Sequence, residues 1–341
     1  MSTKEYEDAI RQTWRHTVGS LTGTQAVQRE LVRYATLAPS SHNTQCWKFA
    51  LDDSGISIMP DLSRRCPAVD PDDHHLFVSL GCAAENLVQA GRTNGLMGEV
   101  HLDSAAGGTV RITLEPIKSI ISPLFQAIPH RQCSRAAYDG QPLSNGDLKQ
   151  IERAARGEGI AVLLLTEKSQ IETVIEYVVQ GNTAQIQDPA FVQELKAWIR
   201  FSGDEAVRTG DGLFSRSMGN PAVPRWLGNM LLNVFLTPNK ESAKHAKHIR
   251  SSAGLAVFVS EADDKLHWVE AGRCYERFAL QTTALNIRNA FVNQPVEVAA
   301  LRSQFASALG LGNRRPDLVV RFGHGPEMPR SLRRPIDSVI V

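Results

Sequence analysis

The chain has 341 residues, of which 42% are hydrophobic and 21% are charged, a composition that fits a folded globular protein and excludes a disordered one. Its 37 Lys and Arg residues nearly balance 36 Asp and Glu residues, so no global field attracts nucleic acid or an anionic membrane. We therefore expect neither as a partner, and any anion site must be local. The length favours two domains or two halves.

The cysteines and the termini favour a cytoplasmic protein. The five cysteines are scattered and form no CxxC pair, which fits reduced thiols better than a disulfide framework or a zinc site. Residues 1–14 have no apolar run after their charges, which argues against a secretory signal. No run of 18 apolar residues predicts a membrane-spanning helix.

The first part of the chain alternates helices and strands. Apolar residues at helical spacing predict a helix over residues 24–37, which Pro39 ends. A polar loop, LAPSSHNTQCW, follows it, and KFALDDSGISIMPD then predicts a β-hairpin. Residues 70–96 predict a long helix that carries a cluster of small residues, and residues 107–117 alternate as a strand does.

A similar order of elements returns later. A capped helix is expected over residues 144–156, and strands are expected at IAVLLLTE, SAGLAVFVSE and PDLVVRFGHG. HWVEAGRCYERFALQTTALNI predicts a second long helix, with Gly272 near its start. We interpret this as a weak internal repeat with halves over residues 1–125 and 126–341.

Residues 183–247 fit neither half. They combine Trp198, Phe201, Phe214 and Trp226 with Gly and Pro breaks, which predicts a helical insertion with an apolar underside. Such an insertion is either a lid over a site or an extra packing layer, and the sequence leaves both open.

Two clusters of arginines indicate a local anion site. Arg131 and Arg135 lie four residues apart in HRQCSR, which predicts a shared face at the start of a helix. PRSLRRPI near the carboxyl end adds Arg330, Arg333 and Arg334. Side chains of this kind bind phosphate, and no glycine-rich phosphate loop is present. Solvated helix faces are the alternative for each cluster taken alone.

Other polar residues point less clearly to chemistry. His74-His75 and the pair His245 and His248 could bind a metal, but no convergent third ligand is evident, so a solvated or capping role is favoured and no metal is expected. Ser40 lacks the GxSxG surroundings of a nucleophile. We identify no catalytic protein side chain.

Several motifs together resemble the FMN-dependent nitroreductase family. APSSHNTQCW resembles the family's APSxxNxQPW loop, HRQCSR resembles its RxSxR helix start, and VVRFGHGPEMPRSLRRPI is similar to its closing strand and arginine-rich turn. Two such halves in one chain, with WIRFSGDEAVRTGDGL in the insertion, resemble the tandem Acg-type branch. The similarity covers nearly the whole chain.

The resemblance implies an α+β, nitroreductase-like fold in which the two half-repeats form an intrachain pseudodimer with a helical insertion. The first half carries the polar loop and the second carries the arginines, so one FMN site is expected across the pseudo-twofold axis, with the second site lost. The chain is then a monomeric pseudodimer, and further homo-oligomerisation remains open.

The resemblance also implies roles for individual residues. Arg131 and one of the terminal arginines would bind the phosphate, and Arg135 would lie at the N1 and O2 edge of the flavin ring. Asn293 and Gln294 lie where the family directs a backbone N–H at N5. Cys133 replaces the family's Ser or Thr, and Cys46 its Pro. The full set of expected cofactor-binding residues is Pro39, Ser40, Ser41, Asn43, Gln45, Arg131, Cys133, Arg135, Asn293, Gln294, Arg330, Arg333 and Arg334.

Two functions follow from the resemblance. The first is ping-pong hydride transfer from NAD(P)H through FMN to an electron-poor small molecule, a nitroaromatic or a quinone, with the flavin supplying the chemistry. The alternative is a flavin-sequestering or storage protein in which the insertion covers the flavin and NAD(P)H turnover is small. The sequence identifies neither the electron acceptor nor which of NADH and NADPH is the electron donor.

Overall fold

The computed structural model describes residues 3–17 and 21–341 and has two antiparallel four-stranded sheets. In spatial order, the first sheet contains β1 (Trp47–Asp52), β2 (Gly55–Pro60), β4 (Thr109–Pro116) and β3 (Leu96–Asp103). The second contains β5 (Ile160–Leu165), β8 (Gly254–Ser260), β10 (Arg315–Gly323) and β9 (Arg288–Phe291). The predicted α+β class is confirmed.

The two sheets share one strand order when their strands are numbered within each half. In each sheet the spatial order is first, second, fourth and third strand, so the third strand lies at the edge. The expected hairpin is present, with Trp47 opposite Pro60 and Asp52 opposite Gly55. The edge strands β3 and β9 were not predicted.

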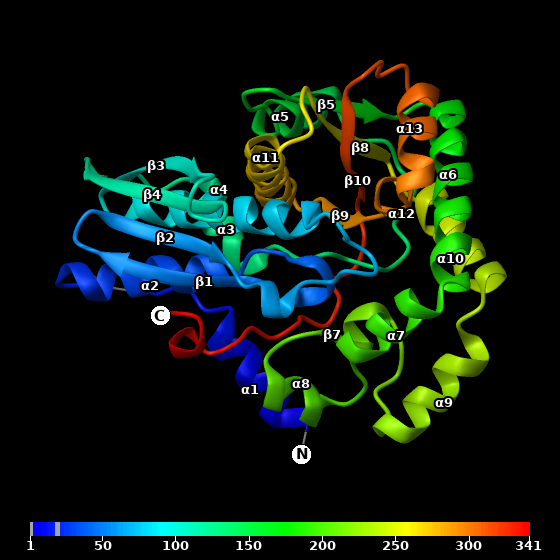
Figure 1. Cartoon of the computed structure of the whole chain (residues 1–341), viewed down its shortest axis with the longest axis horizontal. Coiled ribbons are helices and arrows are strands. Elements are labelled where there is room, and N and C mark those ends of the chain that lie inside the picture. Colours follow the sequence, from blue (N-terminus) through cyan, green and yellow to red (C-terminus); the bar gives the residue numbers. More distant parts are fainter. Residues whose placement is uncertain (1–2, 18–20) are drawn as a thin grey trace.

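Two long helices lie between the sheets (Figure 1). They are α3 (His74–Thr93) and α11 (Lys265–Ala284). A Cβ atom on Gly81 would lie 2.0 Å from the carbonyl oxygen of Val269, and one on Gly272 would lie 2.0 Å from that of Val78. The contact is reciprocal: the backbone of each helix lies directly against the glycine of the other. One hydrophobic core, with residues from both sheets, surrounds this contact.

Shorter helices complete the two halves. They are α1 (Thr3–Thr13), α2 (Thr24–Thr36), α4 (Pro123–Ala127), α5 (Asn145–Ala154), α12 (Gln294–Glu297) and α13 (Ala299–Ala308). The expected helices over residues 24–37 and 144–156 correspond to α2 and α5. The expected boundary between residues 125 and 126 falls within α4.

A long helical segment connects β5 to β8. It contains α6 (Lys168–Gln187), α7 (Pro189–Trp198), α8 (Gly203–Thr209), α9 (Arg225–Phe235) and α10 (Pro238–Arg250), with the short parallel strands β6 (Ile199–Arg200) and β7 (Leu213–Phe214). Val174 and Val178 of α6 and Ile249 of α10 belong to the core of the second sheet. Helices α7 to α9 lie away from that sheet, at the bottom of Figure 1.

The carboxyl-terminal tail crosses from the second sheet back to the first. The N–H of Phe49 in β1 donates to the carbonyl of Val339, and the N–H of Val341 donates to the carbonyl of Phe49. The last residues thus extend the sheet that contains β1. Among the described helices, none has the length and apolar character needed to span a bilayer.

The contact between α3 and α11 predicts that neither glycine tolerates a methyl group. We expect Gly81→Ala to lower the free energy of unfolding by about 3 kcal/mol, the upper range for overpacking, because the new Cβ meets a backbone atom that cannot rotate away. Urea-induced unfolding followed by circular dichroism measures this. Gly146→Ala in α5 is the control, since its Cβ would meet no atom closer than 3.5 Å. Equal stability of the two variants would contradict the prediction.

Candidate cofactor site

The polar loop after α2 is conformationally strained. It contains a short 3₁₀ turn, Ser41–Asn43, and three of its non-glycine residues have positive φ: His42 (47°), Asn43 (54°) and Gln45 (53°). Such conformations cost roughly 1–3 kcal/mol each, so the surrounding structure must hold them in place.

The insertion and the tail hold this loop. The Asn43 amide donates to the carbonyls of Gly212 (3.0 Å) and Leu332 (3.2 Å). The Gln45 amide donates to the carbonyl of Gly210 and accepts from the N–H of Arg334, both at 2.8 Å. Loop, insertion and tail therefore form one hydrogen-bonded unit.

The segment that carries Arg131 and Arg135 is extended. The predicted helix start is wrong: Arg131 has φ −62° and ψ 137°, and the next helix, α5, begins at Asn145. The physical reason is pairing with the edge strand β9, where Cys133 forms a parallel bridge to Asn289 and the N–H of Ser134 donates to the Asn289 carbonyl.

Arg131 is held by a buried carboxylate. Its side chain lies 3.3 Å from Glu276 of α11 and donates to the carbonyl of Leu37 at 3.0 Å. Burial raises the pKa of Glu276 to about 7, and the Arg131 cation opposes this rise. Arg131 thus ties α11 to the end of α2.

The terminal arginines also bind carbonyl groups. Arg333 donates to the carbonyls of Thr36, Leu37 and Ala38, which lie at the end of α2. This arrangement caps the helix by satisfying carbonyls that have no partner within it. Burial lowers the pKa of Arg333 to about 9, and the nearby Arg131 cation acts in the same direction. The guanidinium of Arg330 donates to the carbonyls of Pro129 and His130.

Two adjoining hollows lie where the loop, the extended segment and the tail meet. The smaller, of about 530 Å³, is lined among others by Pro39, Ser40, Asn43, Arg131, Cys133, Arg135, Arg330 and Arg333. The larger, of about 960 Å³, is lined among others by Pro39, Ser40, Ser41, Arg135, Asn293 and Gln294. Of the expected residues, Gln45 and Arg334 line neither of these two hollows, and they support the loop from behind.

Arg135 differs from the other arginines of the site. It lines both hollows, and within residues 3–17 and 21–341 its guanidinium has neither a hydrogen bond nor an ion pair. A second unsatisfied group is the side-chain amide oxygen (Oε1) of Gln294, which is buried without a partner among the described residues. A ligand that carries an anionic group and a hydrogen-bond donor would pair with the Arg135 guanidinium and with the Gln294 side-chain oxygen.

The larger hollow contains His75 and His245, for which the sequence favours a solvated or capping role. His75 is only 5% exposed, so the solvated role is wrong for it, and the Asn293 amide lies 3.4 Å from its ring. His245 lies 3.2 Å from the Gln294 amide, and burial together with nearby cations lowers the pKa of His245 to about 4. The sequence showed these histidines but gave no sign of which cavity they line.

The insertion forms part of the walls. Leu213 lines both hollows, Ser217 lines the smaller, and Gln185 and Phe191 line the larger. Residues of the insertion therefore line both hollows. Whether the insertion acts as a lid or as a packing layer stays a prediction.

Comparison with known proteins gives two kinds of similarity. No protein-family model matches the chain. Two curated proteins of Mycobacterium tuberculosis (strains CDC 1551 / Oshkosh and ATCC 25618 / H37Rv), each named "Putative NAD(P)H nitroreductase", are 26% identical over 326 residues. The match covers 92% of this chain and 90% of each relative.

Solved structures give weaker similarities. A nitroreductase with bound FMN from Bacteroides fragilis is 15% identical, with a TM-score of 0.38, and the match covers 63% of this chain and 94% of that one. An FMN-dependent nitroreductase from Mycobacterium smegmatis in complex with NADPH is 12% identical, with a TM-score of 0.43 and coverages of 63% and 96%.

Arg333 caps α2 through its planar guanidinium. We therefore predict that a lysine at this position, which keeps the positive charge, does not preserve the stability of the protein. We expect Arg333→Lys to lower the free energy of unfolding by about 2 kcal/mol, because an ammonium cannot reproduce the planar fork that reaches three carbonyls. Urea unfolding without added flavin measures the change. Arg208→Lys is the matched control, since Arg208 is exposed. If both variants unfold like the parent protein, Arg333 does not stabilise the end of α2.

Proposed function

We propose that the chain is an FMN-binding oxidoreductase of the nitroreductase type, with NAD(P)H as electron donor and an electron-poor nitroaromatic or quinone as acceptor. The observation that carries the proposal is the cavity in which the polar loop, the extended basic segment and the tail converge. The sequence similarity to proteins named as nitroreductases, over nine-tenths of both chains, supports it.

The residues present fit a flavin mononucleotide. The two hollows share Pro39, Ser40 and Arg135, so they adjoin and offer one elongated recess to a ligand that has a ring and a phosphate. Four arginines line the smaller one, which creates the local positive potential that a phosphate needs. Pro39, Ser40 and Ser41 are short, so a flat ring can approach the backbone closely.

The arginines would have different roles. Because the Arg131 and Arg333 side chains already donate to carbonyls near the end of α2, we assign them to the support of Pro39 and Ser40 and to the field at the phosphate. The donors of Arg135 have no partner in the part of the chain that the structure describes, so Arg135 would contact the cofactor directly, at the anionic edge of the ring. We assign Asn293, Gln294 and Cys133 to the remaining contacts.

When bound, FMN accepts a hydride from a reduced nicotinamide and passes electrons to the acceptor. The chain would orient the two ligands and exclude water, and no catalytic side chain is proposed. In the larger hollow, burial lowers the pKa of His42 and of His245 to about 4, so both imidazoles are neutral at pH 7. A neutral, flat substrate would meet no positive charge from them.

We also propose that residues 1–125 and 126–341 are two nitroreductase-like halves of an intrachain pseudodimer, and that the protein is cytoplasmic. The equal strand order of the two sheets and the reciprocal contact of α3 with α11 support the first point. Each half contributes a different wall, so one site per chain is expected.

The second candidate function is flavin sequestration. The observation that favours it is that Phe191 and Leu213, both from the insertion, line the larger hollow and narrow the route to a bound ring. If the insertion stays closed, a bound flavin would be retained but not reduced. Opening of such a cover on the microsecond to millisecond scale would permit turnover.

An anaerobic titration distinguishes the two candidates. We expect the purified protein to be yellow and its visible flavin absorbance to bleach within seconds of adding NADPH or NADH, because a bound flavin takes up hydride. Retention of the colour would support sequestration. A colourless protein that takes up no added FMN would overturn both candidates.

Replacement of Arg135 tests the cofactor assignment. We expect Arg135→Ala to weaken FMN binding on the order of 10–100-fold, the effect of losing one charge-assisted hydrogen bond, with Arg135→Lys intermediate. Quenching of flavin fluorescence measures the affinity. Arg156→Ala, at an exposed site beyond α5, is the control. Arg131 is unsuitable because its removal leaves the buried Glu276 unpaired. Unchanged affinity in Arg135→Ala would refute the assignment.

A further inference from the structure

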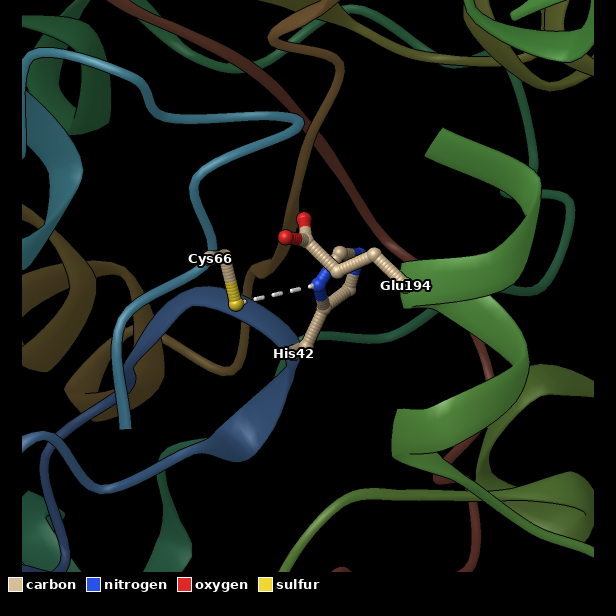
Figure 2. Close-up of side chains that lie close together, drawn as sticks. All are labelled: His42, Cys66 and Glu194. Carbon is tan, nitrogen blue, oxygen red and sulfur yellow. Dashed lines mark hydrogen bonds between the residues drawn. The ribbon is translucent and has the colours of Figure 1, made fainter. Parts of the chain in front are cut away.

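A cluster of three potential metal ligands lies beside the larger hollow (Figure 2). His42 comes from the strained loop, Cys66 from the segment between the 3₁₀ turn Leu62–Arg64 and α3, and Glu194 from α7 of the insertion. The side chains point toward one another in Figure 2. Three segments far apart in sequence thus bring an imidazole, a thiol and a carboxylate together.

The distance between the sulfur and the imidazole nitrogen suits one divalent ion. The Cys66 sulfur lies 3.6 Å from Nδ1 of His42, and the ligand atoms of all three residues lie within 4.8 Å of one another. Tetrahedral Zn²⁺ with typical Zn–S and Zn–N bonds separates these two atoms by about 3.6 Å. No backbone movement is needed to bring sulfur and nitrogen to that separation.

The surroundings orient the ligands. The two carboxylate oxygens of Glu194 accept from the N–H groups of Ala68 (2.9 Å) and Val69 (3.2 Å), the kind of outer hydrogen bond that fixes a ligating carboxylate. His42 has a positive φ, a backbone conformation that recurs at ligand sites. Cys66 is 4% exposed, so the sulfur is shielded from bulk solvent.

We propose that His42, Cys66 and Glu194 form a binding site for one divalent cation of the zinc class. Three protein ligands leave a fourth position for water or a substrate atom. A thiolate and a carboxylate together supply two negative charges, which balance the ion. The site would cross-link the insertion to the two loops beside the cavity and hold α7 in place over it.

Protons compete with the metal at this site. Burial lowers the pKa of His42 to about 4, so its imidazole is neutral and ready to ligate at pH 7. Burial raises the pKa of the Cys66 thiol, so metal binding must release its proton. The charged or titratable groups that act on His42, Cys66 or Glu194 are Arg135, His75, Cys46, Asp70, Asp188 and Glu297.

Equilibrium dialysis of the full, tag-free protein against Zn²⁺ tests the site. We expect one Zn²⁺ per chain, and a Co²⁺ difference spectrum with a thiolate-to-metal charge-transfer band. Cys66→Ser should abolish that band, and His42→Ala and Glu194→Gln should each weaken binding by more than about tenfold. Cys46→Ser, at another buried thiol, should leave the band unchanged.

The outcomes are distinct from those of the flavin experiments. Circular dichroism and the melting temperature without metal show whether each variant folds. Absence of a charge-transfer band in the parent protein, or a band that persists in Cys66→Ser, would overturn the proposal whether or not FMN binds. A higher melting temperature with Zn²⁺ in the parent but not in Glu194→Gln would support the cross-link to α7.

Discussion

The close backbone contact between α3 and α11 is the constraint on which the rest of the structure depends. Gly81 and Gly272 let the two helices approach until each carbonyl fills the space of a missing Cβ. The hydrophobic core, both sheets and the walls of the cavity are arranged around this contact. Because the contact is reciprocal, it imposes an approximate twofold relation on the two helices and on the groups that follow along them.

That relation extends to buried charges, where the two sides diverge. Glu85 and Glu276 each lie four residues after their glycine. Glu276 pairs with Arg131, which donates to the carbonyl of Leu37, just beyond α2. Glu85 pairs with Arg277, which donates to the carbonyl of Ala154 at the end of α5. On both sides a buried glutamate pairs with an arginine that donates to a carbonyl at the end of a helix. On the Glu85 side, Arg277 also forms an ion pair with Glu270. A network of paired charges therefore lies on the Glu85 side.

The sequence predicted the elements that are determined locally. The long helices, the hairpin and the segment between β5 and β8 follow from periodicity and turns. The strand β3 was missed although Leu96, Val100 and Leu102 alternate with exposed neighbours, and β9 is too short to give a signal. The expected helix at Arg131 failed because pairing with β9 overrides spacing. The arginines illustrate the limit of a sequence: only tertiary structure shows that Arg333 donates to carbonyls at the end of α2, while Arg135 has no hydrogen bond or ion pair among the described residues.

The crossing of the carboxyl-terminal tail has a consequence for assembly of the cavity. Its walls come from both halves, and the tail pairs with β1, yet all of them belong to one polypeptide. Formation of the cavity is therefore a unimolecular event. A site shared between two separate chains is lost on dilution by mass action, whereas walls that belong to one chain do not separate on dilution. The effective concentration of one half around the other is set by the covalent chain and not by expression level.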